Sequence, residues 1–294
     1  MAVRQRPETA SGATALTPAA RLYLDLLKGC LTRDLFGQAY RSLAPYSRGL
    51  ALMVRWGQRL LAKRQLVLMV KTSSNARAEG RDWPADAETM IGRRRLDNLE
   101  ACILDALDRG VPGDLLEAGV WRGGACIFMR ATLEACGDAE RMVWVADSFQ
   151  GLPRPDPERF PADHVYQSLD LDIAVPLAAV KANFARYGLL DDRVRFLVGW
   201  FSDTLATAPV ERLAVLRLDG DMYQSTTEVL EALYPRLSVG GYLIVDDYAL
   251  PSCKTAVDDY RAKHEIVDPI EPIDWTGVYW RKTAARSGVQ ITES

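Results

Sequence analysis

The chain has 294 residues, 48% of them hydrophobic and 26% charged, which is typical of a folded globular protein and excludes a disordered or fibrous one. Its 36 basic and 39 acidic side chains give a net charge of −3, so no general positive field exists and we expect no nucleic-acid partner. The two histidines, His164 and His264, lie far apart in sequence, which argues against a metal site built from several imidazoles. The five cysteines are scattered without a CxxC pair, so we expect reduced thiols and a cytoplasmic location.

Residues 1–82 are predicted to precede the main domain. Residues 1–18 lack the apolar run of a signal peptide and are expected to form a disordered tail. Residues 19–82 are expected to form a helical extension, with helices over 20–31 and 49–70 and a polar loop over 71–82. Basic residues interrupt the 49–70 stretch, which therefore predicts an amphipathic helix that covers another surface. Attachment of this helix to a membrane surface is the alternative.

Residues 83–284 alternate between short apolar runs and helical patterns, before a tail over 285–294. Strands are predicted over 114–120, 142–146, 194–198, 213–218 and 241–245. Helices are predicted over 97–109, 124–136, 176–187, 225–237 and 252–264. A final pair of extended segments, 265–270 and 275–281, is predicted to be joined by a turn. This alternation is typical of an α/β fold with a parallel sheet covered by helices on both faces, in which ligands bind beyond the carboxyl ends of the strands.

The first two strands end in residues suited to a nucleoside. Residues 117–124 (EAGVWRGG) form a glycine-rich turn, although the spacing is neither that of a dinucleotide-binding motif nor that of a P-loop. Asp147 follows the second strand, about one βαβ repeat after Gly119, where a carboxylate can accept hydrogen bonds from ribose hydroxyls. The alternatives are a simple tight turn and an Asx turn or helix cap. Trp200 and Phe201 follow the third strand and suit either core packing or stacking on adenine.

Three aspartates follow the fourth and fifth strands. Asp219 comes directly after the fourth strand, and Asp246 and Asp247 directly after the fifth. Neighbouring strands lie about 5 Å apart, so these carboxylates should converge and repel one another unless a cation joins them. Oxygen ligands select a hard ion such as Mg²⁺ or Ca²⁺. The alternative is that Asp219 caps the next helix while Asp246 and Asp247 form a solvated turn.

Several long stretches resemble the macrocin O-methyltransferase family, whose members use S-adenosylmethionine and a metal to methylate sugar hydroxyls of antibiotics. The resembling stretches are 23–32 (YLDLLKGCLT), 79–98 (EGRDWPADAETMIGRRRLDN), 117–124 (EAGVWRGG), 147–151 (DSFQG), 218–224 (LDGDMYQ), 245–248 (VDDY) and 273–281 (IDWTGVYWR). The resemblance covers residues 21–282. Only the connection over 36–71 departs from it, being longer than in the antibiotic enzymes, and this leaves the acceptor open.

The resemblance implies a Rossmann-like, seven-stranded class I methyltransferase fold with an N-terminal helical lid. It implies a glycosylated small-molecule acceptor, with Mg²⁺ held by Asp219, Asp246 and Asp247 and with Asp219 as general base. We also expect a homo-oligomer. The residues expected to bind S-adenosylmethionine are Thr89, Met90, Glu117, Gly119, Val120, Trp121, Arg122, Gly123, Asp147, Ser148, Phe149 and Ser202.

Two other functions remain open from the sequence. Asp219-Gly220-Asp221 also matches the DxD pattern with which a nucleotide-sugar glycosyltransferase holds a metal and a diphosphate. A methyltransferase fold without activity could serve as a scaffold through residues 49–70, but the intact set of three mutually repelling acids argues against it.

Overall fold

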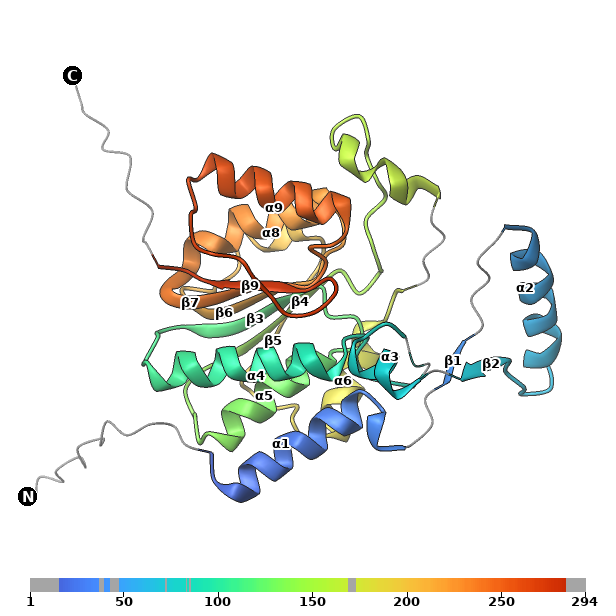
Figure 1. The fold of residues 1–294 in the computed structure, drawn as a ribbon, viewed down its shortest axis with the longest axis horizontal. Coiled ribbons are helices and arrows are strands. Elements are labelled where there is room, and N and C mark those ends of the chain that lie inside the picture. The colour runs from blue at the N-terminus through green and yellow to red at the C-terminus, as the bar shows by residue number, and fades with distance from the viewer. Residues whose placement is uncertain are drawn as a thin grey trace, which may run out of the picture.

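The computed structural model describes residues 16–36, 40–42, 48–71, 73–82, 84, 86–168 and 173–283 (Figure 1). Its main feature is a seven-stranded sheet in the order β5-β4-β3-β6-β7-β9-β8, parallel from β5 to β7, with antiparallel β9 and β8 at one edge. This confirms the predicted α/β class I methyltransferase fold. The seven strands are β3 (Asp114–Ala118), β4 (Val143–Asp147), β5 (Val194–Val198), β6 (Leu213–Leu218), β7 (Leu237–Val245), β8 (Glu271–Pro272) and β9 (Val278–Arg281).

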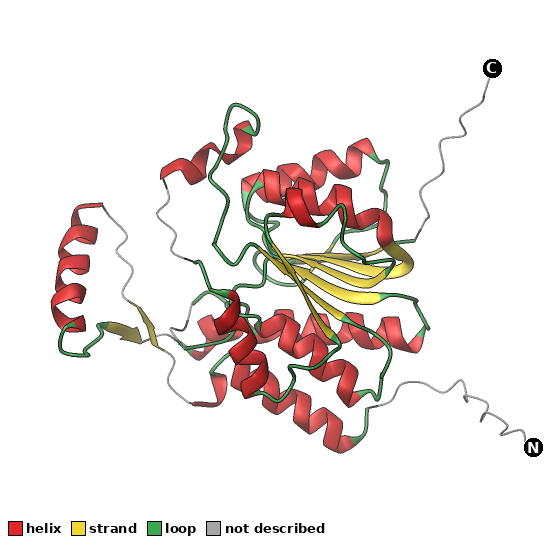
Figure 2. Cartoon of the chain, turned by 180° about the vertical axis from the view of Figure 1, so that it is seen from behind, coloured by secondary structure: helices red, strands yellow, loops and turns green. Residues whose placement is uncertain are grey.

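Helices cover both faces of the sheet, as Figures 1 and 2 show. On one face pack α4 (Arg93–Asp108), α5 (Gly124–Ala135) and α6 (Leu177–Arg186), and on the other α8 (Tyr223–Leu233) and α9 (Pro251–Lys263). Each face has its own apolar core, which includes Ile103, Ile127 and Phe184 on the first and Leu230 and Val257 on the second. Shorter helical turns are η1 (Asp34–Phe36), η2 (Pro161–Ser168), α7 (Phe201–Thr204) and η3 (Tyr234–Arg236).

The strand order reverses between β3 and β6, the two central strands. From β3 the chain proceeds outward through β4 to β5, and from β6 it proceeds the other way to β7. Every residue of β6 is buried, as expected for a strand covered on both faces. A ligand crevice is therefore expected beyond the carboxyl ends of β3 and β6, from which the chain continues in opposite directions.

The N-terminal part contributes an outer helix and a projecting segment. Helix α1 (Pro18–Leu31) packs against α5 and α4 through the buried residues Leu24, Leu27 and Leu31. Strands β1 (Tyr40–Ser42) and β2 (Met69–Lys71) form a separate antiparallel pair, and α2 (Arg48–Ala62) lies between them in the chain. Within the described residues, the chain has no helix that is long and apolar enough to cross a membrane.

The predicted helix over 49–70 is too long. Helix α2 ends at Ala62, and Gln65 adopts a left-handed conformation (φ 58°) that stops it. The following apolar run is extended and enters β2. The prediction of a loop over 71–82 is also wrong in part, because it contains α3 (Ser74–Ala78), whose N-terminus is capped by the Ser73 hydroxyl.

The C-terminal pair is shifted relative to its prediction. Residues 265–270 are not a strand, because Glu265 is left-handed (φ 52°) and Pro269 has no N–H to donate. The strand that pairs with β9 is instead β8. The predicted helix over 225–237 ends earlier, at Leu233, because Pro235 follows; β7 then begins at Leu237.

Candidate active site

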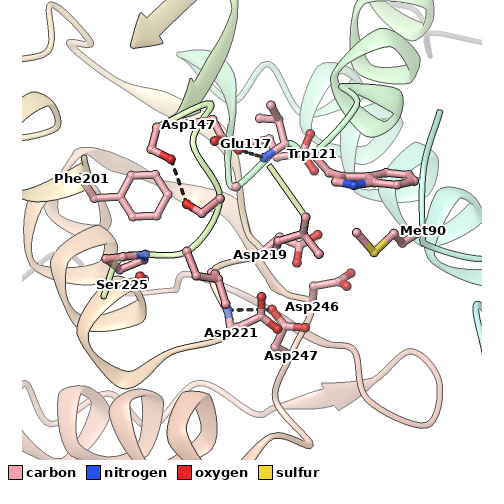
Figure 3. A pocket seen from close by; sticks show the side chains of 18 of the residues that line it. Met90, Glu117, Trp121, Asp147, Phe201, Asp219, Asp221, Ser225, Asp246 and Asp247 are labelled. Carbon is pink, nitrogen blue, oxygen red and sulfur yellow. Dashed lines mark hydrogen bonds between the residues drawn. The ribbon is translucent and has the colours of Figure 1, made fainter. Parts of the chain in front are cut away.

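The carboxyl ends of β3, β4, β6 and β7 line a cavity of about 770 Å³ (Figure 3). Besides these strand ends, its wall includes Gly80 of the N-terminal extension, Tyr166 and Trp275. Most residues predicted to bind a cofactor or metal lie in this one wall. They are Thr89, Met90, Glu117, Gly119, Val120, Trp121, Asp147, Ser148, Ser202, Asp219, Asp246 and Asp247.

The turn after β3 needs glycine for two reasons. Gly119 adopts φ +86°, a conformation that other residues rarely take, and a Cβ at this position would lie 1.7 Å from the carbonyl oxygen of Asp219. The loops after the two central strands therefore touch through this glycine. Gly123, also left-handed, is the N-cap residue of α5. The Gly124 N–H at the start of α5 donates to the Glu88 carbonyl at 3.0 Å, and the next residue, Ala125, lines the cavity.

Asp147 is held rigidly at the end of β4. Its Oδ2 accepts a hydrogen bond from the Val120 N–H at 2.8 Å, and its Oδ1 accepts one from the Phe149 N–H at 2.7 Å. Burial raises the pKa of Asp147, although these backbone bonds oppose the shift. The predicted Asx turn therefore exists. The Trp121 N–H is a third backbone donor to this carboxylate. A carboxylate has about four lone-pair sites, so the local turn and a binding role are compatible.

Three of the predicted residues lie outside the cavity wall. The Arg122 side chain donates to the Ala87 carbonyl at 2.8 Å and stacks on Trp121, so it supports the wall from behind. Gly123 packs against Val180, and Phe149 packs in the core. Their part in cofactor binding stays a prediction.

The three aspartates converge as predicted. Carboxylate oxygens of Asp219, Asp246 and Asp247 all lie within 4.8 Å of one another (Figure 3). The alternative that Asp219 caps the next helix is wrong, since the N–H groups of Tyr223 and Gln224 donate to Asp163 instead, at 2.7 and 3.0 Å. The solvated-turn alternative also fails, because Asp246 is buried.

Two arginines offset part of this negative charge. The buried Arg217 donates to Glu117, Asp219 and Asp246. Arg95 reaches Asp246 from α4 and pairs with Asp274 at 2.7 Å. These arginines were not predicted from the sequence, although Arg217 is the sole charged residue in the apolar run LAVLRL and so offered a signal.

The arginines do not neutralise the whole cluster, and several of its carboxyl groups have raised pKa values. Burial and the charge of Asp246 raise the pKa of Asp219, and burial with the charges of Asp221 and Asp219 raises that of Asp247 well above its usual range. Burial and the charges of Asp219 and Asp246 raise the pKa of Asp221 to about 7, and burial raises the pKa of Glu117 to about 7. A carboxylate cluster with this excess charge is suited to a cation.

The donor set fits one hard divalent ion. Two oxygens on an ion with ligand distances of about 2.0–2.6 Å are at most about 4–5 Å apart, which matches the spacing of the aspartates. Arg217 and Arg95 occupy one lone pair of each Asp246 oxygen, and a carboxylate oxygen has a second one to offer. Within the described part of the chain these three aspartates form the one acidic or sulfur-containing group that could hold a metal.

Comparison with known proteins agrees with this geometry. The family model described as macrocin O-methyltransferase matches residues 20–282. The chain is 50% identical over 273 residues to the 8-demethyl-8-(2,3-dimethoxy-α-L-rhamnosyl)-tetracenomycin-C 4′-O-methyltransferase of Streptomyces olivaceus, covering 92% of this chain and 96% of that one. It is 56% identical over 214 residues to the mycinamicin III 3″-O-methyltransferase of Micromonospora griseorubida, covering 71% and 84%.

A solved structure shares the fold as well as the sequence. The O-methyltransferase NovP superposes with a TM-score of 0.74 at 46% identity, over 90% of this chain and 100% of that one. These matches favour methyl transfer over the glycosyltransferase and scaffold alternatives. The chain belongs to the macrocin O-methyltransferase family and is an O-methyltransferase.

Proposed function

We propose that the protein transfers the methyl group of S-adenosylmethionine to a sugar hydroxyl of a glycosylated small molecule, with Mg²⁺ held by Asp219, Asp246 and Asp247. The observation that carries this proposal is the position of the three aspartates in the same cavity as the glycine turn and Asp147. The Streptomyces olivaceus relative acts, by its name, on a rhamnosyl tetracenomycin, which supports a sugar as the acceptor.

The donor would occupy the side of the cavity formed by β3 and β4. Asp147 would accept hydrogen bonds from the two ribose hydroxyls, and the turn at Gly119 would let the backbone approach the ligand closely. Phe201 and Met90 line the cavity and would offer apolar contacts for the adenine and the methionine chain. Such contacts would orient the methyl donor, and orientation supplies part of the rate enhancement.

The acceptor hydroxyl would lie beside Asp219. A sugar hydroxyl is a weak nucleophile, and a bound divalent cation supplies the electrostatic stabilisation that lowers its pKa. Asp219 takes the hydroxyl proton as the O–CH₃ bond forms and the S–CH₃ bond breaks. Arg217 and Arg95 hold Asp219 and Asp246 in place from the buried side.

We also propose that the N-terminal extension closes the cavity. Gly80 forms part of the cavity wall, and the Glu79 carbonyl accepts a hydrogen bond from the Trp275 indole at 2.9 Å. Arg77 donates to the Met90 carbonyl at 3.0 Å, which ties the extension to the proposed donor site.

The function is tested with methyl-labelled S-adenosylmethionine and a panel of rhamnosylated and other glycosylated acceptors. Label should enter a sugar hydroxyl, the activity should disappear in excess EDTA, and Mg²⁺ should restore it. Full activity in EDTA would contradict the metal, whereas label on nitrogen or carbon would contradict O-methylation. S-adenosylhomocysteine should bind in calorimetry, and nucleotide sugars should not.

The pH dependence of stability provides a separate test of the cation site. The folded, cation-free protein retains protons on Asp219 and Asp247 at pH values where the unfolded chain has lost them. Its stability should therefore fall as the pH rises through these raised pKa values. A cation that relieves the repulsion should increase Tm by more at a pH above the Asp221 pKa of about 7 than at a pH below it. Scanning calorimetry with and without Mg²⁺ measures this difference, and equal shifts at both pH values would refute it.

A further inference from the structure

A basic segment projects from the catalytic body. We define the basic arm as residues 48–71, which comprise α2, the extended run after it and β2. Figures 1 and 2, which view the molecule from opposite sides, both place α2 at the outer edge, beyond the helices that cover the sheet. The described part of the arm therefore projects beyond the helices that cover the sheet.

The charge of the arm differs from that of the whole chain. The arm contains six basic residues and no acidic one, although the complete chain has a net charge of −3. The six residues are Arg48, Arg55, Arg59, Lys63, Arg64 and Lys71. Of these, Arg59, Lys63 and Arg64 lie exposed at the end of α2 and in the turn after it. Such a segment is attracted to a surface with dense negative charge.

The spacing of residues in α2 separates charge from apolar character. Val54 and Leu61 are seven residues apart, so they fall on one face of the helix. Arg59 falls on the opposite face. A helix with one basic and one apolar face is typical of those that lie in the plane of a membrane interface.

The arm also exposes large apolar side chains. Trp56 is 69% and Val67 68% exposed, and Leu60, Leu66 and Leu68 are each about half exposed. Tryptophan is favoured at the boundary between headgroups and hydrocarbon, because its ring is apolar and its N–H is polar. Lysine and arginine next to such side chains can keep their charged ends in water while their stems lie along the apolar layer.

We propose that the basic arm binds the surface of an anionic phospholipid bilayer, with α2 parallel to the membrane plane. A bilayer offers hydrocarbon for Trp56, Leu60 and Val67 and a layer of negative charge for the cations beside them. A nucleic acid would satisfy the charges and leave the apolar side chains in water.

Sedimentation of the full-length protein with vesicles tests this proposal. The protein should bind vesicles of phosphatidylglycerol mixed with phosphatidylcholine, and bind phosphatidylcholine vesicles weakly. Replacing Arg59, Lys63 and Arg64 by Gln should lower the partition coefficient by about a hundredfold, because each cation near the membrane surface adds separately to the binding free energy. Replacing Trp56 and Leu60 by Gln should also weaken binding, while high salt should weaken the native protein's binding.

A matched variant controls for the loss of charge. Lys181→Gln, Arg195→Gln and Arg212→Gln remove three exposed cations from the body, and this variant should bind like the native protein. Equal binding to neutral and anionic vesicles, or unchanged binding by the arm variant, would overturn the proposal. It would also be overturned if native protein ignored the vesicles and W56Q/L60Q converted a dimer to a monomer in analytical ultracentrifugation. Circular dichroism verifies that each variant is folded.

Discussion

Asp219→Asn is expected to lower kcat by about 10³-fold or more while S-adenosylhomocysteine still binds. The substitution removes the proposed proton acceptor and one of three negative cation ligands, and a positioned general base alone contributes about 10²–10⁴-fold. The change keeps the size of the side chain, which lies beside Arg217, so the fold should persist. Steady-state kinetics at saturating Mg²⁺ measures the loss, and titration calorimetry measures binding of S-adenosylhomocysteine.

The comparison variant for this experiment is Asp258→Asn. Asp258 is an exposed residue of α9 that pairs with Lys254, and its neutralisation should leave kcat within about twofold, as surface pairs contribute little. If Asp219→Asn retained near-native turnover, the proposed base and cation site would both be refuted. Loss of S-adenosylhomocysteine binding in the same variant would instead mean that Asp219 serves the donor site.

Gly119→Ala is expected to disrupt the donor and cation sites together. The new Cβ would lie 1.7 Å from the Asp219 carbonyl oxygen, so the loops after β3 and β6 must move apart. The positive φ adds strain of about 1–2 kcal/mol, and overpacking adds about 1–3 kcal/mol. We therefore expect the free energy of unfolding to fall by about 3 kcal/mol in denaturant titration, with affinity for both S-adenosylhomocysteine and Mg²⁺ reduced.

Gly110→Ala separates backbone strain from the clash. Gly110 also has a positive φ, +62°, but a Cβ there would meet no atom within 4 Å. This variant should lose only about 1–2 kcal/mol and should bind both ligands normally. Equal behaviour of the two variants would show that the contact between the two loops has no role in the site.

The position of the site followed from the sequence because parallel strands have a simple geometry. Asp147, Asp219 and Asp246 each stand at or directly after the end of a strand, and the carboxyl ends of parallel strands meet at one edge of the sheet. No long-range contact had to be known to place them together. The sequence also indicated a glycine turn at Gly119. It did not indicate that the Asp219 carbonyl leaves no room for a side chain there.

The ends and caps of helices and strands were harder to predict. They depend on single residues, whose partners can be distant in the sequence. The N-terminus of α8 is capped by Asp163, some 60 residues earlier in the chain, and not by the nearby Asp219. The first strand of the final hairpin begins later than predicted. The apolar pattern at 265–270 predicted a strand, but one left-handed residue and one proline in this segment prevent it. Local periodicity carries no information about either effect.

The sequence by itself determined the alternation of strands and helices, the glycine turn and the identity of the converging acids. Each of these depends on local spacing and on the fixed direction of parallel strands. Only the tertiary structure decided that Arg217 and Arg95 balance those acids and that the basic arm stands apart from the body. Charge pairing and burial depend on which segments meet in space, and that is set by packing of the whole chain.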